Sequence, residues 1–498
     1  MSEDNKVKIR LEKHLWPDEI AEKKRKRRSR FVLITLCLAT FCLGLVLGVS
    51  NAPKSTCLTP TTTQSFTSNK LDSIYNLLSN KWFFAGEVEN ISEDLIDKAL
   101  YGMSSSSLDY HTTYMSRQEV ESFTTSIDMG FVGIGVQYTT ADDLNMITRV
   151  FHNAPAEKAG VLPGDVIYSI DGELVEDFGS SEIESRVKGV EGTDVVIGFL
   201  RDNEVIELTI TRGAVQNTAY GEMLDDEVGY LQIYQFGSST GEEVAGYLEM
   251  MSEMGLKKLV IDVRDDGGGY LEALVDVASS FLPANTVVMK QVYADGSEEL
   301  SIAKEGMFEN IEGIVILVNG NSASAAEVFT LALKEQRDDV TILGTTTYGK
   351  GTVQVTHVFS DGSALKYTTS KWVSPNDVWV NKVGIEPDIE VRLHDILYEG
   401  YTILSDDVTY QYDSVGEDVR LIQLALDFLG YSLDRVDGYF DRSTEKALIQ
   451  FQDEFGIDEK GILNGKTQEA VFSQVTKTWS LDKSYDVQLN QAIELLHQ

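Results

Sequence analysis

The chain has 498 residues, a length typical of about three or four domains, and its hydrophobic content of 42% is enough for folded cores. Its formal net charge of −37 excludes a nucleic-acid-binding protein, because such a protein needs a basic surface. The charge is unevenly placed, since residues 1–30 hold 11 Lys/Arg and 6 Asp/Glu, a net charge of +5, and the remaining residues carry −42.

A basic cluster precedes a long uncharged segment near the N-terminus. Residues 23–30 are almost entirely basic and are followed by 19 residues without charge, 31–49. That length spans a bilayer core as a helix, and the basic flank marks its cytoplasmic side. We therefore predict a cytoplasmic basic tail at 1–30, a single-pass transmembrane anchor at 31–50 and an extracellular body. A cleaved signal peptide is the alternative, which the long basic region disfavours.

The three cysteines lie in or just after this apolar segment, at Cys37, Cys42 and Cys57. The acidic body contains none, so it has neither a disulfide framework nor a metal cluster of the cysteine type. No cluster of His, Asp and Glu has metal-ligand spacing either. We expect no metal and no other cofactor.

Residues 51–68 are rich in Thr, Ser and Pro and have no apolar period, which predicts a linker. Two helical patterns follow. In the first, Leu71, Ile74 and Leu77 form an apolar face; in the second, Ser92 is a predicted N-cap ahead of two acidic residues. Residues 69–130 are thus predicted to be a helical N-terminal region.

Two glycine-containing segments indicate a peptide-binding domain at residues 131–213. The first has glycines that leave backbone N–H groups free for a terminal carboxylate, and the strand after them can pair with an extended peptide. The second, residues 154–167, is typical of a short helix, a turn and a strand. Together they resemble a PDZ domain, although an ordinary hairpin is the alternative. The resemblance implies a β-rich domain that binds a peptide at Phe131, Gly133, Ile134, Gly135 and Val136.

A serine and a lysine stand out in the next part, residues 214–395. Ser324 lies between an apolar run at 314–318, predicted to be a buried strand, and a helical pattern that starts at Glu327. At such a helix N-terminus, backbone N–H groups stabilise negative charge. Lys350 lies between two glycines ahead of another strand. Burial would favour the neutral form of this lysine, which could then act as general base to the serine.

These two motifs resemble those of the C-terminal processing (tail-specific) protease family of serine endopeptidases. The nucleophile motif is Ser324-Ala325-Ala326-Glu327, and the lysine motif is Lys350-Gly351-Thr352-Val353-Gln354. The resemblance extends over about residues 71–391. It implies an α/β protease core in which Ser324 is the nucleophile, Lys350 the general base, and Gln354 the residue that orients the lysine.

The resemblance also implies an oxyanion hole and a dimer contact. Backbone N–H groups of Gly268 and of Ser324 or Ala325 would hold the oxyanion. The helical N-terminal region often contributes to dimer contacts in this family, so a homodimer is an expected assembly. The chain departs from the family where Asp266-Gly267 replace a common Asn-Pro and where Ala326 replaces a common serine. The interval between the serine and the lysine is also one residue longer than usual.

Other chemistries fit the sequence less well. Residues 344–350 match most of a phosphate-binding loop, but Gly351 stands where the magnesium-binding hydroxyl is required. A Ser-His-Asp mechanism needs a placed histidine, and His357 falls on the strand face opposite Gln354. Residues 320–324 fail the nucleophile-elbow pattern because the last is not glycine. Ser322 remains a rival nucleophile.

The C-terminal part contains helical patterns separated by Asp-Gly turns. After a linker at 396–413, residues 414–475 resemble a three-helix peptidoglycan-binding domain. Peptidoglycan is therefore an expected partner, and a helical module used for internal packing is the alternative. The tail, residues 476–498, shows no functional signal.

We conclude from the sequence that the chain is a multidomain α/β protein with one N-terminal transmembrane helix. It is predicted to be a membrane-anchored, extracytoplasmic serine endopeptidase. Its PDZ domain is predicted to recognise protein substrates with unstructured C-termini. The alternative is a non-catalytic scaffold that binds peptides and the cell wall, which would have no reason to keep Ser324, Lys350 and Gln354 together.

Overall fold

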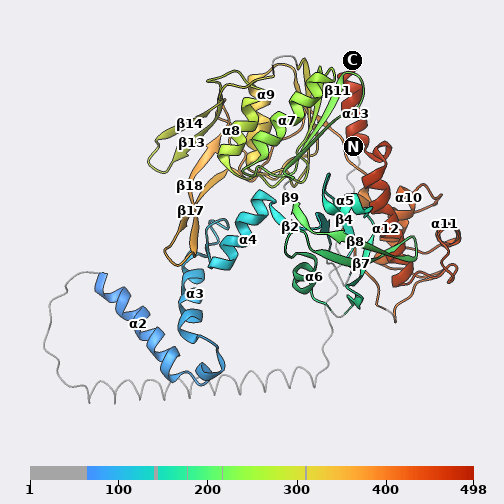
Figure 1. The fold of residues 1–498 in the computed structure, drawn as a ribbon, viewed down its shortest axis with the longest axis horizontal. Coiled ribbons are helices and arrows are strands. Elements are labelled where there is room, and N and C mark those ends of the chain that lie inside the picture. The colour runs from blue at the N-terminus through green and yellow to red at the C-terminus, as the bar shows by residue number, and fades with distance from the viewer. Residues whose placement is uncertain (1–63, 140–143, 177, 216, 309–310, 406) are drawn as a thin grey trace, which may run out of the picture. The chain divides into compact units, whose positions relative to one another are not determined.

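The computed structural model describes residues 64–498 except 140–143, 177, 216, 309–310 and 406 (Figure 1). The predicted basic tail and transmembrane anchor lie outside the described residues, as does most of the predicted linker. Among the helices that are described, none is both long enough and apolar enough to cross a membrane. The chain divides into two compact units, Met1–Leu95 and Ile96–Gln498.

The described part of the first unit, residues 64–95, is mostly helical. Its elements are α2 (Gln64–Lys81), η1 (Ala85–Glu87) and the start of α3 (Ile91–Ser104). The apolar face predicted for α2 is largely exposed, since Leu71, Ile74 and Leu77 are each about half accessible to solvent. The second unit begins within α3.

A helix with a complete N-terminal cap precedes the β-rich domain. In α4 (Arg117–Asp128), the Ser116 hydroxyl accepts from the N–H of Glu119, and the Glu119 carboxylate accepts from the N–H of Ser116. This reciprocal capping box fixes where the helix starts.

The predicted PDZ domain is a set of short antiparallel strands around one hydrophobic core. Strand β2 pairs with β9 and β3 with β4, and the other strands form a sheet in the order β6-β5-β7-β8. Its core includes Ile134, Ile167, Ile183 and Phe199. The elements are β2 (Phe131–Gly133), β3 (Val136–Tyr138), β4 (Ile147–Val150), α5 (Pro155–Ala159), β5 (Val166–Ile170), β6 (Glu173–Leu174), α6 (Ser180–Val187), β7 (Asp194–Arg201), β8 (Glu204–Thr211) and β9 (Gly213–Val215).

The predicted protease core is built on a six-stranded sheet in the order β10-β11-β12-β15-β16-β19. Strands β10 and β11 are antiparallel and the other pairs are parallel. Parallel strands covered on both faces have nearly continuous apolar sequences, as in residues 314–318. The strands are β10 (Ala219–Met223), β11 (Val228–Ile233), β12 (Lys258–Asp262), β15 (Gly313–Val318), β16 (Val340–Gly344) and β19 (Ile389–Glu390).

Helices cover both faces of this sheet. The helices α7 (Thr240–Glu253), α8 (Leu271–Ser279) and α9 (Ala325–Gln336) pack on the face that carries Leu259, Ile261 and Ile316. The alternate residues Val260, Val315 and Leu317 face the other way and pack against α13 (Val487–Leu496), the last helix of the chain. Figure 1 shows α13 beside β11.

A second sheet carries the lysine motif. It has the order β1-β18-β13-β14, with β17 paired to β18 on the same sheet. Gln354 lies on β17 and Lys366 on β18, in a long antiparallel hairpin. The strands are β1 (Thr113–Met115), β13 (Val287–Tyr293), β14 (Glu298–Ile302), β17 (Thr352–Val358) and β18 (Ala364–Val373).

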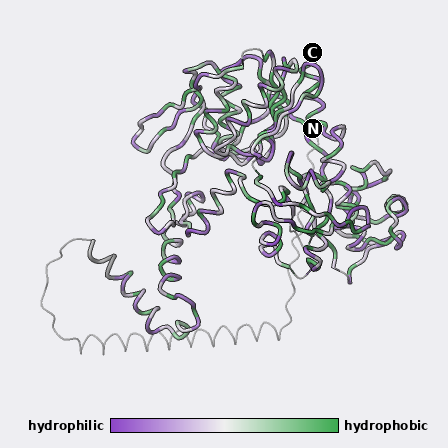
Figure 2. The backbone as a smooth tube through the Cα atoms, in the orientation of Figure 1, coloured by the Kyte–Doolittle hydropathy of each residue, from purple (hydrophilic) through white to green (hydrophobic). Residues whose placement is uncertain are grey.

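The predicted three-helix module is present and has a hydrophobic core of its own. Figure 2 shows hydrophobic and hydrophilic segments alternating along its backbone. Its helices are α10 (Glu417–Phe428), α11 (Arg442–Glu454) and α12 (Gly465–Leu481). The boundary predicted at residue 475 falls inside α12, because apolar contacts of this helix continue to Trp479. The predicted tail is therefore largely helical, with η4 (Lys483–Tyr485) leading into α13.

Candidate active site

Ser324 lies in a strained turn at the start of α9. Its backbone angles are φ 56° and ψ −114°, a region that residues other than glycine rarely adopt. Such conformations persist where the surrounding structure enforces them, and they are concentrated at functional sites. The turn leaves Ser324 partly accessible, whereas the neighbouring Ser322 is fully buried.

Ser322, the rival nucleophile, is used for structure. Its hydroxyl donates to the carbonyl of Val263 at 2.7 Å and accepts from the N–H of Asn319 at 3.0 Å. These bonds join the end of β15 to the residue that follows β12. A buried hydroxyl with both roles occupied has no access to a substrate, which favours Ser324.

Lys350 lies on the loop that leads into β17 and is partly buried. Burial lowers the pKa of its ammonium group, the positive charge of Lys366 lowers it further, and Glu327 opposes both effects. A lysine with a lowered pKa has a larger neutral fraction near neutral pH, as a general base requires. The geometry thus agrees with the desolvated lysine expected from the sequence.

Glu327 joins the two loops. Its carboxylate is fully buried, and one oxygen, Oε2, accepts the N–H of Ser324 at 2.9 Å and the N–H of Lys350 at 2.8 Å. The other oxygen accepts the Thr347 hydroxyl at 2.6 Å and the N–H of Gly349 at 2.7 Å. From the sequence, Glu327 is predicted only as the last residue of the nucleophile motif. Glu327 follows Ser324, the N-cap of α9, by three residues. This is the spacing of a capping box, and it could have indicated from the sequence that the Glu327 side chain bonds to the backbone of Ser324.

The serine and the lysine are not joined to each other here. Among the described residues, no hydrogen bond links Ser324 Oγ to Lys350 Nζ, and none links Gln354 to Lys350. The Gln354 amide instead donates to the hydroxyls of Thr352 and Thr368, at 2.9 and 3.1 Å. The orienting role of Gln354 therefore stays a prediction.

The predicted oxyanion loop lies directly against Ser324. A Cβ atom placed on Gly268 would come within 2.7 Å of Ser324 Cβ and 2.9 Å of the Ala325 nitrogen. Only glycine fits this approach, and its φ of +99° also requires glycine. The N–H of Gly268, however, donates to Asp266 Oδ1 at 2.8 Å. The predicted oxyanion donor is thus already occupied in this conformation.

Asp266, which accepts the N–H of Gly268, is a buried acid. The side chain is fully buried, and burial raises the pKa of its carboxyl well above the usual range, against the effect of the Gly268 N–H. The second carboxyl oxygen, Oδ2, has no hydrogen-bond partner among the described residues. The chain thus buries an acid where the resembling family commonly has asparagine.

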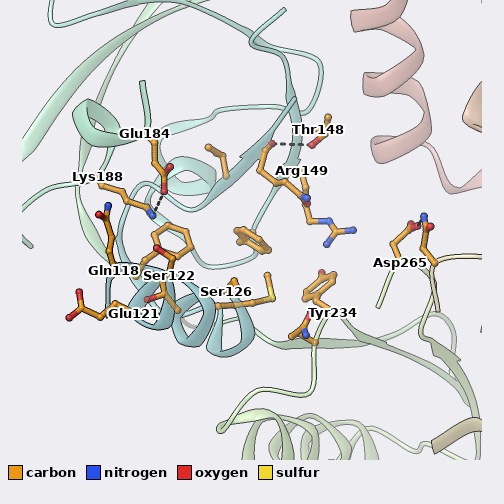
Figure 3. A pocket seen from close by; sticks show the side chains of 18 residues that line it. Gln118, Glu121, Ser122, Ser126, Thr148, Arg149, Glu184, Lys188, Tyr234 and Asp265 are labelled. Atoms are coloured by element: carbon orange, nitrogen blue, oxygen red, sulfur yellow. Dashed lines mark hydrogen bonds and ion pairs between the residues drawn. The ribbon is translucent and has the colours of Figure 1, made fainter. Parts of the chain in front are cut away.

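The predicted peptide-binding segment is divided between a cavity and a core. A cavity of about 870 Å³ is lined by Phe131 and Val136, but the Ile134 side chain is buried in the PDZ core. Figure 3 shows Lys188 and Glu184 of the PDZ domain on one side of this cavity, and Tyr234 and Asp265 on another. The cavity therefore extends from the PDZ domain to the loops that carry Asp265 and Asn321.

Comparison with known proteins decides the family. The chain is 30% identical over 473 residues to the carboxy-terminal processing protease CtpA of Bacillus subtilis (strain 168), covering 95% of this chain and 99% of that protein. Residues 227–391 match the profile of peptidase family S41. The chain belongs to peptidase family S41. This S41 protein is a C-terminal processing serine peptidase, so the resemblance predicted from the sequence is confirmed and the scaffold alternative is set aside.

The accessory domains of this S41 peptidase match as well. Residues 132–211 match the PDZ domain, and residues 415–471 match a peptidoglycan-binding domain. A CtpA-like serine protease of Staphylococcus haemolyticus (strain JCSC1435) is 31% identical, over 93% of this chain and 92% of that protein. Among solved structures, the photosystem II D1 C-terminal processing protease aligns with 23% identity and a TM-score of 0.40, over 67% of this chain and 94% of that one.

Proposed function

We propose that this S41 peptidase cleaves proteins by a Ser-Lys mechanism, after its PDZ domain has bound their unstructured C-termini. The observation that carries the mechanism is the shared oxygen of Glu327, which holds the backbone of Ser324 and of Lys350 at 2.9 and 2.8 Å. One buried carboxylate thereby fixes the nucleophile and the base relative to each other. The lowered pKa of Lys350 supplies the neutral amine.

The reaction would proceed through an acyl-enzyme. Neutral Lys350 accepts the proton of Ser324 as Oγ attacks the scissile carbonyl, and the protonated lysine then donates to the leaving amine. Backbone N–H groups of Gly268 and Ala325, or of Ser324 itself, would stabilise the oxyanion. Water activated by Lys350 releases the acyl group in the second half of the reaction.

Substrate binding would have to complete the site. The N–H of Gly268 donates to Asp266, so it must turn to the oxyanion during activation. Ser324 is not hydrogen-bonded to Lys350, so that hydrogen bond must also form. We assign this role to the PDZ domain, which would either deliver the C-terminal tail or release the inhibited site. The cavity that joins the PDZ domain to the loop at Asp265 supports this coupling.

We further propose that the peptidase is anchored in the cell membrane with its catalytic part outside the cytoplasm. The basic residues of 1–30 and the uncharged segment that follows support this orientation. The peptidoglycan-binding domain supports a location in the cell envelope and peptidoglycan as a partner. The exposed apolar residues Leu71, Ile74 and Leu77 support a homodimer formed through the helical region.

Cleavage of an unfolded protein with a C-terminal tail tests the proposal. The full chain, Ser324→Ala and Lys350→Met would be compared in detergent, since Met keeps the length of lysine without its amine. The proposal predicts that both variants lose cleavage and that a free tail peptide stimulates the wild type. Cleavage that survives in Ser324→Ala would refute the assigned nucleophile.

A further inference from the structure

The last residues of the chain complete the protease core. Helix α13 begins after the peptidoglycan-binding domain has ended, yet it packs on the face of the catalytic sheet opposite α9. Its apolar residues Leu489, Ala492 and Leu496 are buried against side chains from four strands. Those partners are Val228, Tyr230, Val260, Val315, Leu317 and Leu343.

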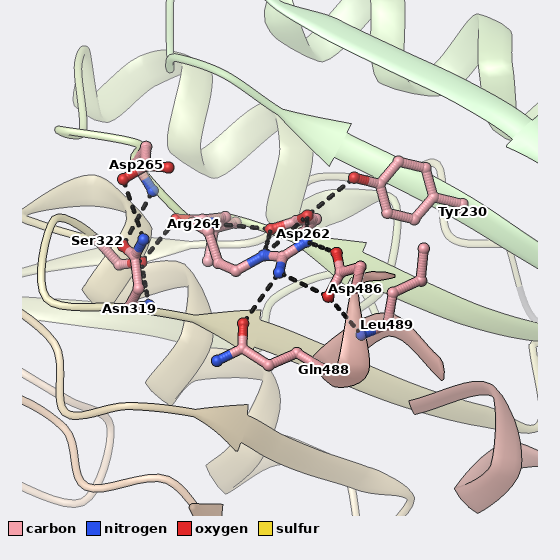
Figure 4. A network of polar contacts seen from close by, with 10 residues as sticks. Tyr230, Asp262, Arg264, Asp265, Asn319, Ser322, Asp486, Gln488 and Leu489 are labelled. Carbon is pink, nitrogen blue, oxygen red and sulfur yellow. Dashed lines mark hydrogen bonds and ion pairs between the residues drawn. The ribbon is translucent and has the colours of Figure 1, made fainter. Parts of the chain in front are cut away.

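A buried ion pair fixes the start of this helix to the end of β12. The Arg264 guanidinium donates to both carboxylate oxygens of Asp486, at 2.7 and 3.1 Å, and to Gln488 Oε1 at 2.9 Å (Figure 4). Asp262 binds the same guanidinium from the other side and accepts the Tyr230 hydroxyl at 2.8 Å. All of these groups are buried, so an acceptor removed here would leave donors of Arg264 without a partner.

Arg264 is also the second residue of the loop that follows β12 and carries Gly268. Further along this loop, the N–H of Asp265 donates to Asn319 Oδ1 at 3.0 Å, and the carbonyl of Asp266 accepts the N–H of Ala323 at 2.9 Å. The loop is therefore held at one end by Arg264 and along its length by the segment that leads to Ser324. Arg264 and Gly268 therefore lie on one loop, which packs against the segment that carries Ser324.

We propose that Asp486 and Gln488 are positioning residues for the oxyanion loop, and that residues 482–498 form a strap that catalysis requires. The inference rests on the proposed Ser-Lys function and adds to it a dependence on the C-terminal end of the chain. Without the strap, Arg264 loses its acceptors Asp486 and Gln488 at the start of α13. The face of the sheet opposite α9 is then exposed to solvent.

The strap also connects the site with the PDZ domain. It continues directly from α12, whose Ser473 hydroxyl donates to the carbonyl of Gly164 at 2.5 Å. On the same helix Lys477 forms an ion pair with Asp202 at 2.8 Å. Gly164 and Asp202 belong to the PDZ domain, so α12 contacts the domain that binds the tail and α13 contacts the residue that positions the oxyanion loop.

The substitution Asp486→Asn separates positioning from folding. Asp486 also caps α13, because its Oδ1 accepts the N–H of Leu489 at 2.9 Å, and asparagine is an equally good cap. Asparagine cannot form the bidentate ionic contact with Arg264. The matched control is Asp482→Asn, since Asp482 caps η4 through the N–H of Ser484. In the part of the chain that the structure describes, the Arg264 guanidinium bonds to Asp262, Asp486 and Gln488 and not to Asp482.

The experiment measures kcat and KM of the full chain on a tail-bearing unfolded protein, together with Tm. Asp486→Asn is expected to lower kcat about 10- to 100-fold with KM nearly unchanged, as for a misplaced transition-state donor. Asp482→Asn is expected to match the wild type. A second variant, Gln488→Leu, keeps Asp486 and should lower kcat by a smaller factor. If Asp486→Asn fails to fold, kcat of Gln488→Leu tests the positioning role instead.

Any of three outcomes would refute the proposed role of the strap. They are wild-type kcat in folded Asp486→Asn and Gln488→Leu, an equal loss in Asp482→Asn, and a change in KM alone. Failure of the proposed function would look different, because the wild type would then be inactive or Ser324→Ala would retain activity.

Discussion

The backbone N–H groups of Ser324 and Lys350 donate to the same oxygen of Glu327, at 2.9 and 2.8 Å. Ser324 opens α9 and Lys350 precedes β17 of the other sheet, so this oxygen links the two sheets at the site. The carboxylate accepts four donors in all and is fully buried. The relative position of the proposed nucleophile and the proposed base thus depends on one residue to which no step of the proposed reaction is assigned.

Replacing Glu327 with glutamine should disrupt this arrangement. An amide has one acceptor oxygen, so its NH2 group would face two of the four donors. Leaving buried donors without acceptors costs about 1–3 kcal/mol of folding free energy, and serine labelling by a fluorophosphonate should become at least about tenfold slower. Urea denaturation and labelling kinetics measure both effects. The exposed Glu249→Gln serves as control, and wild-type labelling in Glu327→Gln would contradict this role.

The activity should rise with pH as Lys350 loses its proton. Because Lys366 helps to lower the pKa of Lys350, Lys366→Gln removes a like charge and should raise that pKa. The rising limb of the kcat/KM profile would then move to higher pH, and activity at neutral pH would fall. Lys257→Gln removes the same charge from an exposed lysine that pairs with Glu227. A profile that moves equally in both variants, or not at all, would show that Lys366 does not act on the base.

Asp266→Asn should stabilise the protein above mildly acidic pH. The folded-state pKa of Asp266 is raised, so the folded protein binds a proton that the unfolded chain releases above about pH 4. The contribution of Asp266 to the stability of the wild type therefore falls as the pH rises from about 4 towards the folded-state pKa. Asparagine keeps an acceptor for Gly268 without this penalty. Tm measured between pH 4 and 8 should show a gain for Asp266→Asn that grows with pH, and none for the exposed Asp226→Asn.

A clash in the PDZ loop should weaken tail binding while leaving the nucleophile reactive. Gly135 has φ +79°, and an added Cβ would lie 2.3 Å from Ala154 Cβ. Gly172 has φ +84° but no atom within 4 Å of an added Cβ, so Gly172→Ala imposes similar strain without the clash. Anisotropy of a fluorescent tail peptide should show weaker binding for Gly135→Ala than for Gly172→Ala. Equal affinity in the two variants would exclude this loop as the tail site.

Much of this organisation could be predicted because it is local in the sequence. The apolar run at 314–318, the small residues after it and the glycines that flank Lys350 predict a buried strand, a helix start and a tight loop without knowledge of the partners. The glycine at 268 likewise signals a close approach, and the structure places it against Ser324. These are patterns that backbone geometry dictates.

What the sequence could not show depends on which segments meet in space. The spacing of Leu489, Ala492 and Leu496 predicts a helix, but not that this helix covers a sheet whose strands lie far upstream in the sequence. Asp266 and Gly268 are two residues apart, yet only the loop conformation reveals that the carboxylate occupies the glycine N–H. Side-chain partners such as Asp486 and Arg264 are chosen by tertiary packing, and no local pattern encodes them.

The most direct test of the central claim is to identify the serine that a fluorophosphonate modifies in the full chain, by mass spectrometry of the labelled peptide. The Ser-Lys account predicts modification at Ser324, loss of labelling in Lys350→Met, and faster labelling when a tail peptide is added. Modification at Ser322, or labelling at Ser324 that is unchanged in Lys350→Met, would contradict it.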